Sequence, residues 1–176
     1  LRLLNVDSNI TYTLNLPAAE ARIYALDGNP LAPRAMPAKG LRLGPGMRVD
    51  LALRVPASGE LALRDGPLRL ATLRAVGAPA EASDWPAPLP ANPIAEPDLQ
   101  RAELLRFNFE WAASLADPAD PVYWQINGKA WQSPAPGCAA QPIARLRLGG
   151  HYLFELRNLS QYLHPIHLHG MTFKVV

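Results

Sequence analysis

Residues 49–55 read Val49-Asp50-Leu51-Ala52-Leu53-Arg54-Val55, so large apolar side chains occupy every second position. Neighbouring side chains of a strand point to opposite faces, and this period therefore predicts a half-buried β-strand. Similar short alternations recur along the first part of the chain, separated by turn residues. They lie at residues 2–6, 11–16, 21–26, 41–43, 61–63 and 68–73. Short strands at this spacing are typical of a β-sandwich or a barrel.

The composition favours the same fold class. The 176 residues include 19 prolines and 12 glycines, and proline removes backbone donors too often here for long helices to persist. The Asp27-Gly28 dipeptide predicts a tight reversal, because glycine tolerates a positive φ, and Asn127-Gly128 predicts a second one. The sequence therefore predicts an all-β protein.

A proline-rich stretch divides the chain. Six prolines lie between Gly77 and Pro97 among Ala, Ser and Asp, and we interpret residues 79–102 as an exposed, semi-extended linker. Residues 1–78 and 103–176 would then be two β modules. In the second module we expect strands at 103–109, 123–129, 144–148, 152–158 and 171–176. A weak similarity between residues 41–49 and 146–153 suggests tandem copies of one fold.

Several classes of protein are disfavoured. A formal net charge of +2 gives no strong cationic field, so we expect neither nucleic acid nor a membrane surface as a partner. The single cysteine, Cys138, excludes an internal disulfide framework and a multi-cysteine metal site within this chain. The first residue is not Met and the last residues continue an apolar alternation, from which we expect the sequence to be part of a longer protein.

Three of the four histidines lie within His164-Pro165-Ile166-His167-Leu168-His169-Gly170. In a strand, positions i and i+2 share a face, so His167 and His169 would present two imidazoles about 6.5–7 Å apart along the backbone. His164 precedes Pro165 and need not share that face, so it could serve a different centre. Imidazole suits zinc, copper, iron and nickel, and the ligands alone leave the metal open. The alternative is three unrelated histidines at the end of a strand.

Residues 164–173 resemble the HPxHLHGxxF signature of multicopper oxidases, which are built from cupredoxin domains. The stretches 125–129 and 149–158 are similar to segments that precede this signature in the family's third domain. Residues 1–5, 25–31 and 43–50 are similar to the second half of its middle domain. The resemblance implies two cupredoxin-like Greek-key β-sandwich modules, each incomplete. Residues 1–78 would be the second half of a copper-free domain, and residues 103–176 the N-terminal part of a copper-binding one.

The resemblance also implies a set of copper ligands. His164 would bind the type 1 copper, His167 the type 2 copper, and His169 a type 3 copper of a trinuclear cluster. The parent protein would oxidise a phenol, an amine or a metal ion by one-electron steps and reduce dioxygen to water. The family implies a periplasmic or secreted location.

This chain departs from the family pattern in one respect that matters. The family's His-Cys-His segment, which supplies the type 1 thiolate, is not in the sequence, and Cys138 has no neighbouring histidine. We therefore assign no catalytic residue, and we expect this chain alone to be inactive. We expect its partners to be the missing segments of its parent or other copies of itself. Two alternatives are a copper-free cupredoxin-scaffold binding protein of the cell envelope and a relative of copper nitrite reductase.

Overall fold

The computed structural model describes residues 1–17, 19–55, 59–77, 84–111, 124–130 and 141–176. Within these ranges the regular secondary structure consists of β-strands, and no helix there is long and apolar enough to cross a membrane. The all-β prediction is therefore confirmed. The chain divides into two compact units, Leu1–Ile94 and Ala95–Val176, which are described separately.

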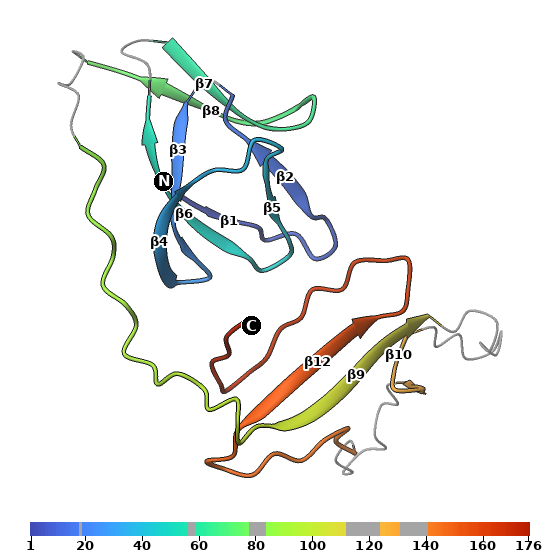
Figure 1. Ribbon diagram of the computed structural model, residues 1–176. Coiled ribbons are helices and arrows are strands. Elements are labelled where there is room, and N and C mark those ends of the chain that lie inside the picture. The colour runs from blue at the N-terminus through green and yellow to red at the C-terminus, as the bar shows by residue number, and fades with distance from the viewer. Residues whose placement is uncertain (18, 56–58, 78–83, 112–123, 131–140) are drawn as a thin grey trace. The chain divides into compact units, whose positions relative to one another are not determined.

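The first unit contains two four-stranded sheets in which all neighbouring strands are antiparallel (Figure 1). One sheet has the order β1-β6-β3-β4 and the other the order β5-β2-β7-β8. The strands are β1 (Arg2–Leu4), β2 (Tyr12–Asn15), β3 (Glu20–Leu26), β4 (Asn29–Ala35), β5 (Leu41–Leu43), β6 (Arg48–Arg54), β7 (Gly59–Asp65) and β8 (Leu68–Ala75).

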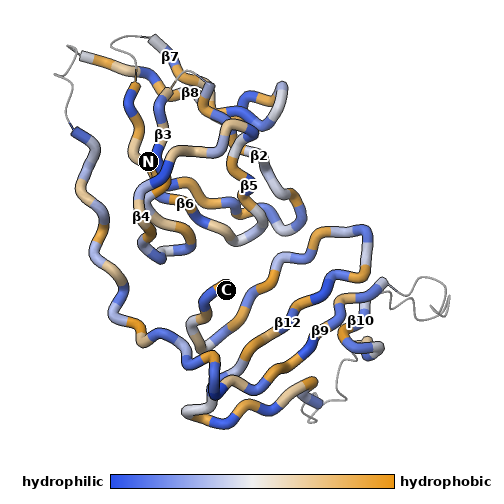
Figure 2. The backbone as a smooth tube through the Cα atoms, in the orientation of Figure 1, coloured by the Kyte–Doolittle hydropathy of each residue, from blue (hydrophilic) through white to orange (hydrophobic). Residues whose placement is uncertain are grey.

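The core of this unit contains side chains from both sheets. Ile23 of β3 is fully buried and Val49 of β6 is 1% exposed, and they join Leu14 and Leu63 of the other sheet in one apolar cluster. Along β6, Val49 and Leu51 are buried whereas the residue between them is half-buried. The same alternation of apolar and polar residues is visible along the strands in Figure 2. The predicted period of two is thus confirmed at Val49 and Leu51, whereas Val55 lies beyond the end of β6 and is 49% exposed.

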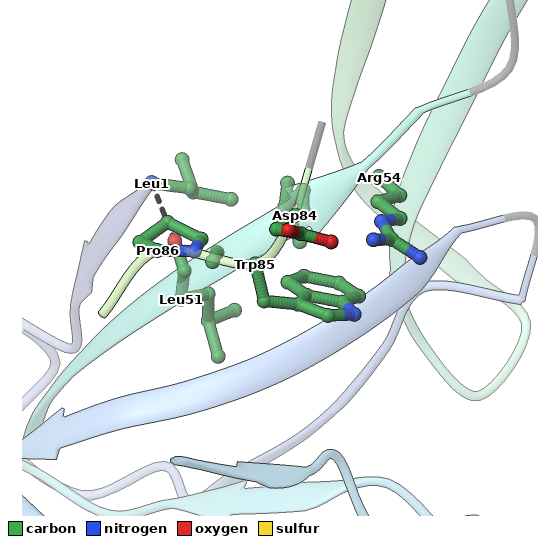
Figure 3. Close-up of a pocket in the computed structure, with 8 residues that line it drawn as sticks. Leu1, Leu51, Arg54, Asp84, Trp85 and Pro86 are labelled. Atoms are coloured by element: carbon green, nitrogen blue, oxygen red, sulfur yellow. Dashed lines mark hydrogen bonds between the residues drawn. The ribbon is translucent and has the colours of Figure 1, made fainter. Parts of the chain in front are cut away.

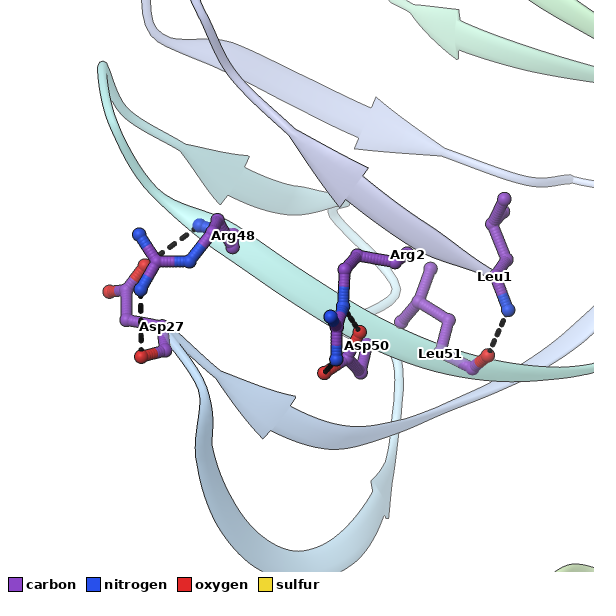
Figure 4. Close-up of polar contacts among 6 residues, drawn as sticks. All are labelled: Leu1, Arg2, Asp27, Arg48, Asp50 and Leu51. Carbon is purple, nitrogen blue, oxygen red and sulfur yellow. Dashed lines mark hydrogen bonds and ion pairs between the residues drawn. The ribbon is translucent and has the colours of Figure 1, made fainter.

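The predicted Asp27-Gly28 reversal joins β3 to β4. Asp27 has φ of 51° and Gly28 has φ of 80°, the paired positive values that a tight hairpin turn requires. The carboxylate of Asp27 accepts a hydrogen bond from the backbone N–H of Arg48 at 2.7 Å, and the Arg48 guanidinium donates to the Asp27 carbonyl at 2.9 Å (Figure 4). The turn is therefore attached to the start of β6.

Trp85 and Pro86 of the proline-rich stretch contact side chains of β3 and β6. Both Arg22 and Arg54 place their guanidinium carbons over the Trp85 ring, 4.6 and 4.5 Å from its centre. Tyr24 donates a hydrogen bond of 2.6 Å to the carbonyl of Pro86, and Trp85 lines a cavity of about 380 Å³ beside β6 (Figure 3). The segment from 84 onward is mostly exposed and contains no strand up to residue 102. The domain boundaries given above stay predictions.

Among the residues described in the second unit, four strands form a sheet with the order β11-β10-β9-β12. Its strands are β9 (Glu103–Trp111), β10 (Trp124–Ile126), β11 (Lys129–Ala130) and β12 (Tyr152–Asn158). Strand β12 runs parallel to β9, whereas β10 is antiparallel to both of its neighbours. Asn127 and Gly128 have φ of 53° and 69°, so the second predicted reversal is also confirmed.

Two strand predictions in this unit are wrong. Residues 144–148 form no strand, because the N–H of Arg147 donates to the Tyr152 hydroxyl at 2.7 Å and its carbonyl accepts from Gly150 in a turn. Residues 171–176 form no strand either, and the segment that carries His167 and His169 is not a strand. An alternating pattern becomes a strand only where another backbone pairs with it, and no described residue pairs with these two segments.

Candidate metal centre

The histidine-rich segment follows the end of β12. The N–H of Leu159, the first residue after this strand, donates to the carbonyl of Phe109 on β9 at 2.9 Å. The parallel pairing of β12 with β9, which ends at Asn158 opposite Phe109, thus continues into the loop. The loop that carries His164 therefore starts from a fixed point on the sheet.

A compact set of hydrogen bonds shapes this loop. The side-chain oxygen of Asn158 accepts from the N–H of Ser160 at 2.9 Å, and its side-chain nitrogen donates to the carbonyl of Tyr162 at 2.6 Å. The N–H of Tyr162 donates to the Ser160 hydroxyl at 3.1 Å. An asparagine that bonds the backbone in this way reproduces a turn locally, so the chain reverses just before His164.

His164 lies against side chains from two strands of the sheet. Its ring centre is 5.6 Å from that of Phe109 on β9 and 4.8 Å from that of Trp124 on β10, with the Trp124 ring almost perpendicular at 89°. Its Nε2 atom is 2.8 Å from the hydroxyl oxygen of Ser160. The imidazole is half-buried and is held both by packing and by one hydrogen bond.

Three aromatic side chains form a cluster next to His164. Trp111 and Trp124 are partners in the β9–β10 register, and their ring centres are 4.6 Å apart. Tyr162 contacts both rings, at 5.2 and 5.4 Å. These three side chains are 37%, 44% and 43% exposed. Sequence reasoning missed this cluster, because its members come from three separate segments and no local pattern links them.

His167 and His169 lie side by side. Their ring centres are 4.7 Å apart, their planes make an angle of 77°, and both residues are exposed. The i and i+2 rings are therefore adjacent even though the backbone between them is not part of a sheet. Within the described ranges, no three side chains among His, Cys, Asp and Glu come together around one point. The structure brings His167 and His169 together, and ligation of a metal by any of the three histidines stays a prediction.

One carboxylate near this loop has a shifted pKa. Glu155 on β12 accepts a hydrogen bond from Arg106 of β9 at 2.7 Å and a second one from Arg157 at 2.7 Å. These two bonds, that from Arg106 first, hold the pKa of Glu155 below its usual range. The ionised carboxylate therefore links the two parallel strands just before the loop begins.

The donor set suits copper without being specific for it. Neutral imidazole is a good ligand for copper, and the adjacent rings of His167 and His169 could bind one ion or two close ones. On His164 the Nε2 atom is hydrogen-bonded to Ser160, which leaves Nδ1 as the ring nitrogen that could bind a metal ion. The thiolate that a type 1 centre needs is not offered by the described residues, and Cys138 lies outside them.

Comparisons with known proteins agree on one family. A sequence profile described as multicopper oxidase matches residues 114–176. The crystal structure of a multi-copper oxidase from Pseudomonas parafulva is 53% identical, covers 99% of this chain and has a TM-score of 0.83. A multi-copper oxidase from Pseudomonas thermotolerans is also 53% identical, covers 97% of the chain and has a TM-score of 0.73.

A more distant structure, Lac15 from a marine microbial metagenome, is 28% identical over 61% of this chain, with a TM-score of 0.53, and the match covers 30% of Lac15. No curated protein matches the chain. The chain spans 41% and 39% of the two Pseudomonas structures, so it corresponds to less than half of their length. Its all-β architecture is that of the cupredoxin-fold oxidases it matches. The chain belongs to the multicopper oxidase family.

Proposed function

We propose that the protein containing this chain is a copper-dependent oxidase that transfers single electrons from a reducing substrate to dioxygen. The observation that carries the proposal is the separation of the three histidines into two environments. His164 is half-buried and packs against the rings of Phe109 and Trp124, whereas His167 and His169 form an exposed pair 4.7 Å apart. Two kinds of copper centre would need this division.

The three histidines would have different roles. His164 would hold the type 1 copper, His167 the type 2 copper and His169 a type 3 copper. Copper held by these residues would supply one-electron transfer at the first centre and the reduction of dioxygen to water at the cluster. The reductant would be a phenol, an amine or a metal ion. The remaining ligands, including the type 1 thiolate, would come from other parts of the protein, and its location would be periplasmic or extracellular.

The chain's own contribution is to orient the imidazoles. Phe109 and Trp124 limit rotation of the His164 ring and cover part of it from water. The loop hydrogen bonds of Asn158 fix where the motif begins. A ligand that is already held in place loses less conformational entropy when metal binds, which favours a fixed geometry.

The proposal is tested in the full-length protein by copper content and visible absorption. His164→Ala is expected to abolish the visible charge-transfer band of thiolate-bound copper while leaving other copper bound. His167→Ala and His169→Ala are expected to lower the copper content while retaining that band.

His151→Ala is the matched control, because His151 lies outside the motif and just before β12. It should change neither quantity. Retention of the band in His164→Ala, or unchanged copper content in both of the other variants, would contradict the proposal.

A further inference from the structure

We infer that Ser160, oriented by Asn158, is a positioning residue that fixes the tautomer of His164 and leaves Nδ1 as the ring nitrogen available to a metal. This inference rests on the proposed function for its metal and on the loop geometry for its tautomer. It concerns two residues to which neither the sequence motif nor the comparisons give a role.

The orientation of the Asn158 amide is determined by two backbone groups. Its Nδ2 lies 2.6 Å from the carbonyl oxygen of Tyr162, which can only accept a hydrogen bond. Its Oδ1 lies 2.9 Å from the N–H of Ser160, which can only donate one. Exchanging the amide's nitrogen and oxygen would place like groups against each other at both contacts. Oδ1 is therefore the atom that faces the Ser160 hydroxyl, at 2.9 Å.

The single proton of the Ser160 hydroxyl then has a preferred acceptor. A hydroxyl can donate once and accept twice. Oδ1 of Asn158 is an obligate acceptor at 2.9 Å, and the N–H of Tyr162 is an obligate donor to the hydroxyl at 3.1 Å. The carbonyl oxygen of Tyr162, at 3.3 Å, is a second and more distant obligate acceptor. The remaining neighbour is Nε2 of His164 at 2.8 Å. If the hydroxyl donates its proton to Asn158 and accepts from the N–H of Tyr162, it has one lone pair left, which faces Nε2. A hydrogen bond between the hydroxyl and Nε2 then requires that Nε2 carries a proton.

Protonation of Nε2 determines the state of Nδ1, the other ring nitrogen of His164. A neutral imidazole with Nε2 protonated has an unprotonated Nδ1, and the lone pair of Nδ1 is then free to bind a metal. A 180° flip of the ring would place Cε1 where Nε2 lies and so break the bond to Ser160, and Phe109 and Trp124 pack against the ring. A hydrogen bond of this kind fixes both the tautomer and the orientation of a ligating histidine, and its loss typically weakens metal binding about 10–100-fold.

The test uses the full-length protein in its metal-free form, labelled with ¹⁵N-histidine. Long-range ¹⁵N–¹H correlation spectra report which ring nitrogen carries the proton, and His164→Gln assigns the His164 signals. With the imidazole neutral, the wild-type His164 is expected to be protonated at Nε2. Ser160→Ala should give a mixture of tautomers, and Ser160→Thr, which keeps the hydroxyl, should restore the single one. Ser8→Ala, at an exposed position of the first unit, is the control.

A metal-binding measurement separates this inference from the proposed function. Copper titration at the His164 centre is expected to show affinity about 10–100-fold lower in Ser160→Ala than in wild type, with recovery in Ser160→Thr. Protonation of Nδ1 in the wild type, or an unchanged tautomer in Ser160→Ala, would overturn the role of Ser160. A third outcome is that His164 shows the predicted tautomers but binds no copper in the wild type. That outcome would overturn the proposed function and leave the tautomer assignment standing.

Discussion

Arg2 and Asp50 lie opposite each other on β1 and β6, and their side chains form a two-point ion pair. The Nε atom of Arg2 is 2.5 Å from Oδ1 of Asp50, and Nη2 is 2.9 Å from Oδ2 (Figure 4). The hydrogen bonds from Arg2 hold the pKa of Asp50 below its ordinary value, and the same contact raises the pKa of Arg2. The carboxylate thus favours the folded state only while it is ionised.

Asp50→Asn is expected to lower the free energy of unfolding in a pH-dependent way. Because the folded pKa is depressed, the contribution of Asp50 is complete above the unfolded value of about 3.9 and is lost as the pH falls through the lower folded value. The difference between wild type and variant should therefore be constant near neutrality and shrink in acid. Denaturant unfolding at several pH values measures it.

Glu60→Gln serves as the control for this experiment. It removes the more exposed ion pair between Glu60 and Arg74, and such pairs contribute little. A difference for Asp50→Asn that grew on acidification would contradict the assignment.

Trp85→Ala is expected to release the segment around residues 84–86 from strands β3 and β6. The variant loses two cation–π contacts and the packing of a half-buried ring, which together should cost about 2 kcal/mol in the free energy of unfolding. Limited proteolysis should then cut faster within residues 84–94. Tyr24→Phe removes only the hydrogen bond to Pro86 and should cost about 1 kcal/mol. Equal cleavage rates in wild type and Trp85→Ala would contradict this view of the segment.

Gly40→Ala is expected to lower the free energy of unfolding by about 2–3 kcal/mol. Gly40 has φ of 88°, and a β-carbon there would lie 2.7 Å from Oδ1 of Asn15 and 2.8 Å from a methyl group of Thr13. Gly46→Ala is the matched control, since its φ is 74° but nothing lies within 4 Å of the added carbon. It should show only the backbone strain, about 1 kcal/mol. Equal losses in the two variants would show that contact with Asn15 and Thr13 adds nothing.

Ile23→Ala should be among the most destabilising single changes in the first unit. The side chain is fully buried between the two sheets, so its truncation leaves a cavity and should cost about 2–5 kcal/mol of unfolding free energy. Ile94→Ala, where the side chain is 47% exposed, should change stability by less than about 0.5 kcal/mol. Chemical denaturation of both variants measures the two changes in unfolding free energy. A loss of less than about 0.5 kcal/mol for Ile23→Ala would contradict the assignment of Ile23 to the core.

Local sequence was sufficient to predict those strands and turns that depend on the residues of one short segment. The alternation at residues 49–55 became β6, and the two Gly-containing dipeptides at 27–28 and 127–128 formed the expected reversals. The alternation at 144–148 did not become a strand, because pairing depends on a second backbone that a local pattern cannot reveal. The same limit explains why residues 171–176, for which we also expected a strand, do not form one.

In the candidate site, too, some residues could be predicted from local sequence and others could not. The motif identified His164, His167 and His169 directly, since three histidines in six positions form a local signal. The surroundings of His164 depend on β9 and β10, which bring Phe109 and Trp124 to it from positions far earlier in the chain. Ser160 is near in sequence, but its role follows from the hydrogen bonds of Asn158, and those depend on the turn of the loop.

The parallel pairing of β9 with β12 has a kinetic consequence. It joins Arg106 to Glu155 across 49 positions, so a long loop must close before the first hydrogen bond of this pair can form. Antiparallel β9 and β10 are closer in sequence and can associate earlier, which leaves one edge of β9 open to other chains until β12 docks. His164 follows β12 in the chain, so we expect it to reach Phe109 and Trp124 only after β12 has paired with β9.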